Sequence, residues 1–530
     1  SLLPYVSQSV DACDNTNLQT DVNPLQNRSM KNADLRKLAE KGDSDAQFRY
    51  GQIYEEGSRD LKQDSKEAVK WFRKAAEQNY APAQNSLGQM NLSGCGIEQS
   101  DSEAIKWFRK AAEQNYAAAQ ANLGYMYSTG KAIEQNDTQA LKWYRKAVEQ
   151  NHAGAECNLG TMFYEGRGVE QSDSEAVKWF RKAAVQNNAN AQNYLGLMYK
   201  NGKGVKQNDS EAVKWFRKAA ELNNPSAQDN LGVMYSFGRG IELDDIEAIK
   251  WFRKAAEQNH ATAQNNMGMM YLYGMGVKKN NFKAVEWFQR SAEQGYAIAQ
   301  CKLGEMYEHG WGTDQSSTKA VEWFRKAADQ NHPSALYHLG NMYEKGRGVE
   351  QNNSEAAKWY LKATEHNHAA AQVSLGLIYL SNKGVEQNYS EAAKWIRKAA
   401  EQGNILAMSK LGLLYLEGRG LSQNDSEAAK WLHKAAEAND AHAQSSLGIM
   451  YLVGRGVRQN DSEAFKWFLK AAEQNDDSAQ CSLGFMYASG KGIKKNDIEA
   501  CKWFQKAAKQ GYALAQKNLG EMYIRGSGVK

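Results

Sequence analysis

The sequence is poor in proline and cysteine, has no long apolar run and carries little net charge. Only 5 prolines and 6 cysteines occur in 530 residues, whereas there are 44 glycines and 14 tryptophans. No apolar run reaches about 18 residues, so we expect no transmembrane helix. The net charge of +5 is small for this length and does not indicate a nucleic-acid partner. The composition suits many short amphipathic elements around a thin, continuous core better than several separate globular domains.

The N-terminal region contains no targeting signal that the sequence reveals. The first residue is Ser1, and no lysine or arginine precedes Arg28, so the charged-then-apolar pattern of a secretory signal is missing from this stretch. The sequence therefore leaves the compartment open between the cytoplasm and secretion.

Tryptophan recurs at a constant interval of 36 residues from Trp71 to Trp503, and of the 14 tryptophans only Trp311 departs from it. Glycine keeps the same step from Gly88 to Gly520. Such self-similarity predicts a repeat architecture. We define a column as the set of residues that lie a multiple of 36 positions from a reference residue in the unit 81–116. Column 89, for example, contains Gln89 and its equivalents.

Each unit contains two helical patterns. Ala83, Leu87 and Met90 lie at i, i+4 and i+7, on one face of a first helix. A second stripe, which Trp107 broadens, predicts a second helix and consists of Ala104, Ile105, Phe108, Ala111 and Ala112. A helix pair of this kind cannot bury its apolar faces alone, so neighbouring pairs must stack. The sequence therefore predicts an all-α solenoid of antiparallel helix pairs, with about 13 repeats of 36 residues.

The ends of the predicted helices are marked by their usual residues. Gly94 and its equivalents suit the left-handed residue that ends a first helix, and the one exception is Asn382. The stretch 208–211, Asn-Asp-Ser-Glu, is a typical N-terminal cap for a second helix. Pro82, Pro225 and Pro333 fall in the first turn of first helices, where a missing N–H is tolerated.

The repeat resembles the Sel1-like repeat family of TPR-like α-solenoids. The residues that carry the resemblance in one unit are Ala227, Leu231, Gly232, Tyr235, Gly238, Gly240, Ile241, Ala248, Trp251, Phe252, Lys254, Ala255, Ala256 and Glu257. The resemblance covers about residues 34–529. It implies a right-handed superhelix with the first helices on its concave side. It also implies an adaptor or scaffold role, as in bacterial host interaction and signalling or in eukaryotic membrane-protein quality control.

Four regions are expected along the chain. They are a non-repetitive segment at 1–30, a capping half-repeat at 31–43, a solenoid at 44–523 and a truncated loop of a further repeat at 524–530. The solenoid should hold 13 helix pairs and one unpaired first helix. Because an unpaired helix exposes an apolar face, we expect the natural protein to continue.

The sequence contains no motif for catalysis, cofactor binding or metal binding. Four histidines share one turn column that polar residues fill elsewhere, and they are His152, His260, His332 and His368. Glutamates such as Glu67 and Glu103 recur at helix starts, and an enzyme does not need one general acid per repeat. We find no phosphate-binding loop, nucleophile elbow or His-x-x-x-His motif. The sequence predicts a protein that is not an enzyme and has no cofactor.

Cysteines and basic residues have structural explanations. The cysteines are expected to be free thiols, because those sharing a column never lie in adjacent units; they are Cys13, Cys95, Cys157, Cys301, Cys481 and Cys501. Column 95 is basic in most units, at Lys131, Arg167, Lys203, Arg239, Arg347, Lys383, Arg419, Arg455 and Lys491. A favourable charge near a helix C-terminus explains this column. The alternative is a basic rim for an acidic partner or for lipid.

A partner-binding surface is predicted on the first helices. On a helical wheel, columns 85, 89 and 92 point away from the core direction set by Leu87, and these columns vary between repeats. Their apolar members in the first half are Tyr125, Leu197, Val233, Met269 and Leu272. In the second half they are Leu377, Leu380, Leu413, Leu416, Ile449, Leu452 and Phe485. An exposed apolar patch of this extent typically marks an interaction site. The alternative is that column 89 is shielded between neighbouring first helices.

A second candidate contact lies in two loops. The basic column becomes Met275 and then Trp311, close in sequence to Tyr273. A tryptophan on a loop is a frequent interaction hot spot, although packing on a neighbouring loop explains it equally simply.

The leading hypothesis is a non-catalytic adaptor that binds one or more proteins or peptides, and not nucleic acid, on its concave face. A rival hypothesis is an exported bacterial factor that engages a host protein or the cell envelope. A hypothesis of another class is an enzyme acting on cell-wall or small-molecule substrates. The sequence leaves the oligomeric state open.

Overall fold

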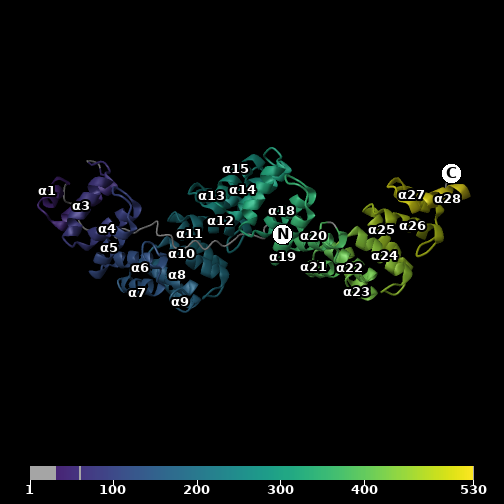
Figure 1. The fold of residues 1–530 in the computed structure, drawn as a ribbon, viewed down its shortest axis with the longest axis horizontal. Helices are drawn as coiled ribbons and strands as arrows, with labels where there is room; N and C mark the ends of the chain where they lie inside the picture. Colours follow the sequence, from purple (N-terminus) through teal and green to yellow (C-terminus); the bar gives the residue numbers. More distant parts are fainter. Residues whose placement is uncertain (1–31, 59–60, 383, 529–530) are drawn as a thin grey trace. The chain divides into compact units, whose positions relative to one another are not determined.

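The computed structural model describes residues 32–58, 61–382 and 384–528. In this part of the chain it contains 28 helices and no strand (Figure 1). The predicted non-repetitive segment 1–30 lies outside the described residues. Every described helix is too short or too polar to cross a lipid bilayer.

Helix α1 (Asn32–Glu40) precedes an alternation of first and second helices. The first helices are α2 (Ser44–Glu56), α4 (Ala81–Ser93), α6 (Ala117–Thr129), α8 (Ala153–Glu165), α10 (Ala189–Asn201), α12 (Pro225–Phe237), α14 (Ala261–Tyr273), α16 (Ala297–His309), α18 (Pro333–Lys345), α20 (Ala369–Ser381), α22 (Ile405–Glu417), α24 (Ala441–Val453), α26 (Asp477–Ser489) and α28 (Ala513–Arg525).

The second helices alternate with them. They are α3 (Ser65–Glu77), α5 (Asp101–Glu113), α7 (Asp137–Val148), α9 (Asp173–Val185), α11 (Asp209–Glu221), α13 (Asp245–Glu257), α15 (Asn281–Glu293), α17 (Ser317–Ala328), α19 (Asn353–Glu365), α21 (Tyr389–Glu401), α23 (Asp425–Glu437), α25 (Asp461–Glu473) and α27 (Asp497–Lys509).

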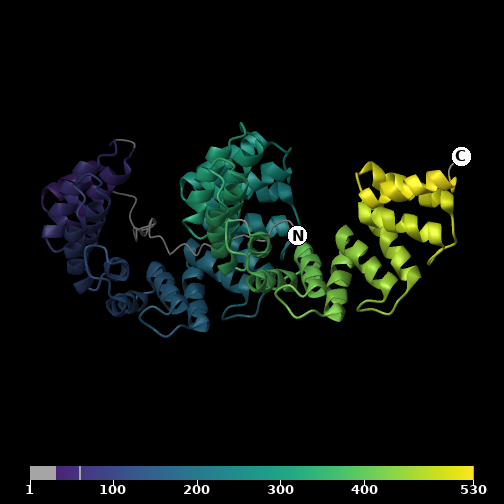
Figure 2. The same cartoon turned by 45° about the vertical axis from the view of Figure 1, so that its right-hand side comes forward.

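The chain divides into two compact units, Ser1–Lys279 and Asn280–Lys530. Within each unit every helix packs against the helix before it and the helix after it, as Figures 1 and 2 show. The predicted all-α solenoid of helix pairs is therefore confirmed. Its right-handed superhelical form stays an expectation from the resemblance.

The predicted helix ends are confirmed. Gly94 ends α4 in the left-handed conformation, with φ 72°, and Asn382 ends α20 in the same way with φ 52°. Asn208 caps α11, because its side-chain oxygen accepts from the backbone N–H of Glu211. The second helices also stop at a left-handed residue, such as Asn115 with φ 63°. Both helices of a repeat thus end at a residue that tolerates positive φ.

A glycine on the first helix allows an aromatic ring of the following second helix to lie against its backbone. A Cβ atom added to Gly196 would lie 2.6 Å from the ring of Phe216, and one added to Gly340 would lie 2.7 Å from the ring of Tyr360. Both rings are completely buried. Since real Cβ atoms do not approach so closely, only glycine permits this packing between the two helices.

The periodic tryptophans join each second helix to the helices before it. Trp107 on α5 packs against the buried cluster that α3 and α4 form. Its outer ring face is covered by Lys110, whose Nζ lies 4.4 Å from the ring centroid. All 13 tryptophans of this column have such a cation over the ring, at 3.9 to 4.7 Å. The contact shields the indole from water and keeps the ammonium exposed.

A ladder of glutamine side chains links successive repeats. Buried Gln84 donates from Nε2 to the carbonyl oxygen of Ala76 at 3.1 Å, and its Oε1 accepts from Nε2 of Gln114 at 2.6 Å. The same pairing recurs at 2.8 to 3.0 Å in Gln150–Gln120, Gln258–Gln228, Gln330–Gln300, Gln402–Gln372, Gln474–Gln444 and Gln510–Gln480. In most rungs the first-helix glutamine also donates to a carbonyl oxygen in the last turn of the preceding second helix, as Gln120 does to Ala112.

Where the ladder is interrupted, both partners usually change together. In two repeats apolar or non-pairing residues fill both positions, as Leu336 with His366 and as Met408 with Ala438. Gln192 is the exception, because it faces Leu222, and its Oε1 is buried without a hydrogen-bond partner. A single missing partner costs more than a joint replacement, since it leaves a buried polar atom unsatisfied.

We predict that Gly196→Ala lowers the local stability of α10 and α11 by about 1 to 3 kcal/mol, because the new methyl group overlaps the Phe216 ring. Hydrogen exchange read by mass spectrometry measures this as faster exchange in both helices. Gly520→Ala is the matched control, since no atom lies within 4 Å of the added Cβ atom in that helix. Alanine there should slow exchange in α28, and equal destabilisation at both sites would contradict the prediction.

We also predict that Leu222→Gln stabilises the α10–α11 layer by about 1 kcal/mol, because the new amide supplies the donor that Gln192 Oε1 lacks. Local opening energies from hydrogen exchange again provide the measurement. Ala438→Gln serves as control, since Met408 offers it no oxygen acceptor. An equal gain in both variants would show that helix-end preference, rather than the ladder, is responsible.

Candidate partner-binding surface

Column 85 is not part of an exposed face. The prediction that it points toward a partner is wrong, because Asn85, Cys301 and Cys481 are all buried. These residues lie between neighbouring first helices, where Asn122 Nδ2 donates to Asn85 Oδ1 at 2.9 Å across the gap between α4 and α6. A helical wheel shows only directions around one helix and does not include the helix stacked beside it.

Columns 89 and 92 lie at the edge of this packing. Ile449 and Phe485 are exposed, with 45% and 44% of their surface accessible. The other predicted residues of the second half are partly buried; they are Leu377, Leu380, Leu413, Leu416 and Leu452. Four of these five pack sideways against the buried clusters beneath them, namely Leu377, Leu380, Leu416 and Leu452. The predicted face is therefore apolar, and Ile449 and Phe485 are the most exposed of its predicted side chains.

The first half of the chain offers less of this surface. Tyr125, Leu197 and Met269 are partly buried. Only 5% of the surface of Val233 and 8% of the surface of Leu272 is exposed, so the prediction that they contact a partner is wrong. Val233 is shorter than the Ile449 and Phe485 side chains of the same column, and the side chain of Leu272 is covered by its neighbours. These two residues belong to the packing between helices.

We name as the apolar strip the residues Leu377, Leu380, Leu413, Leu416, Ile449, Leu452 and Phe485, on α20, α22, α24 and α26. All of them belong to the unit 280–530. Three further exposed apolar residues extend it, at Ile405, Leu406 and Val453. The prediction missed these three, although their columns hold mostly small or polar residues in other repeats. That departure is the signal that would have revealed them.

A network of charged side chains occupies the same face on α16 and α18. Lys302 Nζ lies 2.8 Å from Glu305, and His338 lies 3.7 Å from both Glu305 and Glu308. Arg347 approaches Glu308 at 3.5 Å. Burial lowers the pKa of His338. The carboxylates and cations of this network compensate each other, so its polarity contrasts with the apolar strip that follows.

The four histidines of the turn column cap first helices. Nδ1 of His152 accepts from the backbone N–H of Ala155 at 3.1 Å, and the three equivalents do the same. Burial lowers the pKa of His332 to about 4, so this imidazole is neutral and its ring nitrogen can accept at neutral pH. The structural interpretation of these histidines is confirmed. Among the described residues, no group of three or more His, Cys, Asp or Glu side chains is arranged to hold a metal ion.

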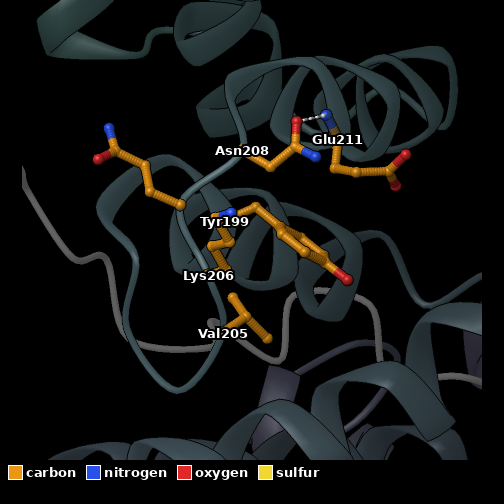
Figure 3. Close-up of a pocket in the computed structure, with 6 residues that line it drawn as sticks. Tyr199, Val205, Lys206, Asn208 and Glu211 are labelled. Atoms are coloured by element: carbon orange, nitrogen blue, oxygen red, sulfur yellow. Dashed lines mark hydrogen bonds between the residues drawn. The ribbon is translucent and has the colours of Figure 1, made fainter.

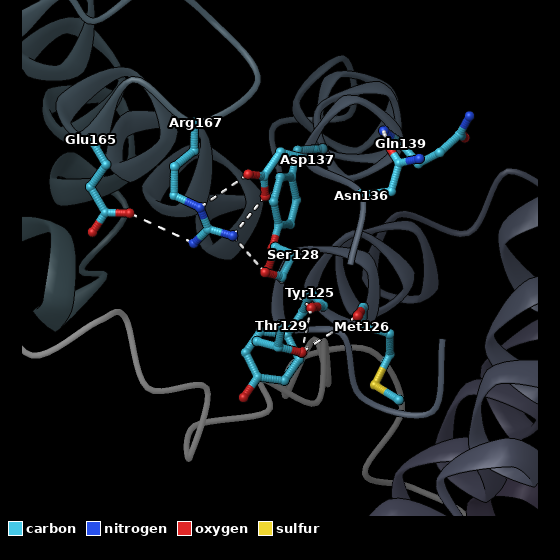
Figure 4. Close-up of polar contacts among 10 residues, drawn as sticks. Tyr125, Met126, Ser128, Thr129, Asn136, Asp137, Gln139, Glu165 and Arg167 are labelled. Atoms are coloured by element: carbon cyan, nitrogen blue, oxygen red, sulfur yellow. Dashed lines mark hydrogen bonds and ion pairs between the residues drawn. The ribbon is translucent and has the colours of Figure 1, made fainter. Parts of the chain in front are cut away.

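Arginines of the basic column bind the preceding repeat. Arg167, in the loop after α8, donates from Nη2 to Asp137 Oδ1 at 2.6 Å and to the carbonyl oxygen of Ser128 at 2.5 Å (Figure 4). Asp137 begins the second helix of the preceding pair. Equivalent ion pairs join Arg239 to Asp209 and Arg455 to Asp425. These arginines therefore connect successive layers, a role that sequence reasoning missed because the partner lies 30 residues away.

The two loop candidates lie in different units. Tyr273 is exposed at 44% and Met275 is partly buried, in the unit that ends at Lys279. Trp311, in the other unit, is exposed at 46% and stacks on the ring of His309 at 4.6 Å. Their role as a hot spot stays a prediction.

A shallow hollow of about 640 Å³ lies beside the loop that follows α10 (Figure 3). Tyr199, Val205, Lys206, Asn208 and Glu211 line it, together with one glutamine. The same six columns form a hollow of about 620 Å³ beside the loop after α24. Because equivalent residues line both, the hollow is a product of the repeat geometry rather than one specialised site.

Comparison with known proteins identifies relatives by sequence and fold. The family model described as Sel1 repeat matches 14 consecutive segments, at 44–80, 81–116, 117–152, 153–188, 189–224, 225–260, 261–296, 297–332, 333–368, 369–404, 405–440, 441–476, 477–512 and 513–530. No curated protein matches the chain.

Two solved structures illustrate the likeness. One is c5321, described as a protective antigen present in uropathogenic Escherichia coli strains displaying an SLR fold. It shares 33% identity over 92% of this chain and 97% of its own, with a TM-score of 0.59. The other is a Sel1 repeat protein from Oxalobacter formigenes, at 33% identity over 46% of this chain and 96% of its own, with a TM-score of 0.43.

Proposed function

This chain belongs to the Sel1 repeat family, and we propose that it is a non-catalytic adaptor that binds a protein or peptide through the apolar strip. Proteins built from this repeat are generally protein-interaction scaffolds. In the superhelix expected for the family, the first helices line the concave side. Many of the polar residues that recur between repeats serve as helix caps, ladder rungs and inter-repeat ion pairs, which disfavours an enzyme acting on cell-wall or small-molecule substrates.

The proposal rests on one observation: apolar side chains are exposed in columns that vary between repeats, as at Ile449 and Phe485. Gly448 and Met450 on α24 are buried and repeat in nearly every unit, while Ile449 between them is exposed and varies. Exposed aliphatic and aromatic groups cost free energy in water, which a partner recovers by covering them. Large apolar side chains that a partner can cover are typical anchors for a helix or an extended peptide. We expect a protein or peptide rather than nucleic acid.

The double variant Ile449→Asp/Phe485→Ser tests the proposal. We expect it to lose the partners that the wild-type chain captures, because a buried carboxylate in an apolar contact is strongly unfavourable. Affinity capture from matched extracts, quantified by mass spectrometry, provides the comparison. Circular dichroism should show unchanged helicity.

The control variant is Val185→Asp/Ile246→Asp. It also introduces charge at exposed apolar residues, but on second helices of the other unit. Equal loss of partners in both double variants would mean that general surface polarity, and not the apolar strip, governs binding.

A second candidate function is an exported factor that meets a host protein or the cell envelope. The similarity to c5321, described as a protective antigen, favours it. Fractionation of producing cells with an antibody against this chain tests the idea. Detection only in the cytoplasmic fraction would contradict it, whereas release into the medium or protease sensitivity on intact cells would support it.

A further inference from the structure

A basic loop edge borders the apolar strip in three repeats. The loop 418–424 contains one arginine, the loop 454–460 contains two, and the loop 490–496 contains three lysines, and none of the three loops contains an acidic residue. Elsewhere column 98 is usually acidic, as at Glu98, Glu134, Glu170, Glu242, Glu350 and Glu386. Here it holds Arg458 and Lys494. The net charge of successive loops therefore rises from +1 to +2 to +3 along the strip.

Hydrogen bonds place this edge directly beside the strip. Arg455 donates from Nη2 to the carbonyl oxygen of Leu416 at 2.8 Å, and Gln459 donates from Nε2 to the carbonyl oxygen of Leu452 at 3.1 Å. Leu416 and Leu452 are strip residues at the last turns of α22 and α24. A ligand that covers them must therefore also come within reach of the loop side chains.

Part of the basic charge is not neutralised by the protein. Arg455 pairs with Asp425 at 2.9 Å, and Lys495 lies 3.6 Å from Asp497. In contrast, Arg458, Lys491 and Lys494 are exposed, and none of them has a carboxylate within 4.0 Å in the described part of the chain. The glutamates that begin the neighbouring second helices are bound by lysines of their own helices at 2.6 Å, as in the Glu463–Lys466 and Glu499–Lys502 pairs. The edge thus offers positive charge to a ligand.

We propose that the occupant of the apolar strip is an amphipathic helix with acidic residues along the flank that faces the basic loop edge. This inference rests on the proposed function and adds the chemistry of the partner. Its apolar face covers Leu413, Leu416, Ile449, Leu452 and Phe485. Its carboxylates meet Arg458, Lys491 and Lys494.

The spacing of the strip favours a helix. Successive first helices meet through side chains, as Asn122 on α6 meets Asn85 on α4, so equivalent strip residues repeat at about 10 Å, the upper end of the spacing of packed helices. A helix advances about 10.5 Å in seven residues, which matches one apolar anchor pair per repeat. Alternate residues of an extended strand are only about 6.8 Å apart and do not match. The strip is also two columns wide, as in Leu413 with Leu416, which suits the broad apolar stripe of a helix.

The partial burial of several strip residues favours a protein partner over a lipid surface. Leu413, Leu416 and Leu452 are partly buried, whereas Ile449 and Phe485 are exposed. A flat bilayer reaches mainly the exposed side chains, whereas the side chains of a packed helix also reach between them. Anionic vesicles are therefore a discriminating probe.

Binding to the full chain is measured by fluorescence anisotropy with synthetic three-heptad peptides. The acidic probe carries leucine at the a and d positions and glutamate at the flanking positions, and the basic probe carries lysine in place of glutamate. We expect the acidic probe to bind more tightly, with an affinity that falls as ionic strength rises. A third probe with a central proline, which breaks the helix, should bind at least about tenfold more weakly.

The double variant Arg458→Glu/Lys494→Glu should weaken the acidic probe about tenfold and strengthen the basic one, because two attractive rim charges become repulsive. Lys206→Glu/Lys278→Glu is the matched control, since it reverses two exposed charges of the same column in the unit that does not contain the strip. That control should leave both affinities unchanged.

The outcomes separate this inference from the proposed function. Equal binding of the acidic and basic probes, lost in Ile449→Asp/Phe485→Ser, would overturn the acidic partner and leave the strip as a binding site. If this double variant binds either probe as tightly as the wild-type chain does, the strip is not the binding site. The chain could instead co-sediment with phosphatidylglycerol vesicles and bind neither peptide. If that co-sedimentation depends on Arg458 and Lys494, the basic loop edge binds lipid and the inference is overturned.

Discussion

The close contact between a first-helix glycine and a ring of the next second helix determines how the repeat is built. At Gly196 the Phe216 ring occupies the space that any side chain would need, so the two helices pack almost backbone to ring. This geometry directs the other columns. It places the tryptophans of the Trp215 column against the preceding helices. It leaves columns 89 and 92 of the first helix at the edge of the packing. A repeat protein can keep such a contact from layer to layer because each layer touches only its neighbours, although Ile396 and Leu432 replace the ring at Gly376 and Gly412.

Some of the recurring polar side chains bind the adjacent repeat. Gln84 receives a hydrogen bond from its own pair and donates to the preceding one, and Arg167 reaches the start of the preceding second helix. These bonds make each interface between layers specific, since a shift in register would leave buried amides unsatisfied. Many of the polar side chains that recur between repeats already take part in such bonds. A ligand must therefore be recognised by side chains that vary between repeats.

Periodicity within one helix was sufficient to predict the helix pairs, their caps at Gly94 and Asn208, and the all-α solenoid. It was insufficient wherever a side chain meets another layer. The helical wheel turned Asn85 toward solvent, but Asn122 of the next first helix covers it. The prediction that Val233 is exposed was wrong for the same reason, whereas Ile449 in the same column is exposed. The Arg167–Asp137 pair joins residues 30 positions apart, and only the stacking of repeats brings them together.

The framework and the recognition surface make separate demands on the sequence. Because stability is nearly a sum over neighbouring layers, a change at Ile449 leaves the glycine–aromatic contacts and the ladder intact. The strip supplies apolar burial, which is largely insensitive to the direction in which a helical ligand runs. The loop charge, rising from Arg419 toward Lys494, is not symmetric along the strip. For the proposed helical ligand we therefore expect apolar contact to set most of the affinity and the charge gradient to distinguish the two directions, since electrostatic complementarity contributes more to specificity than to affinity.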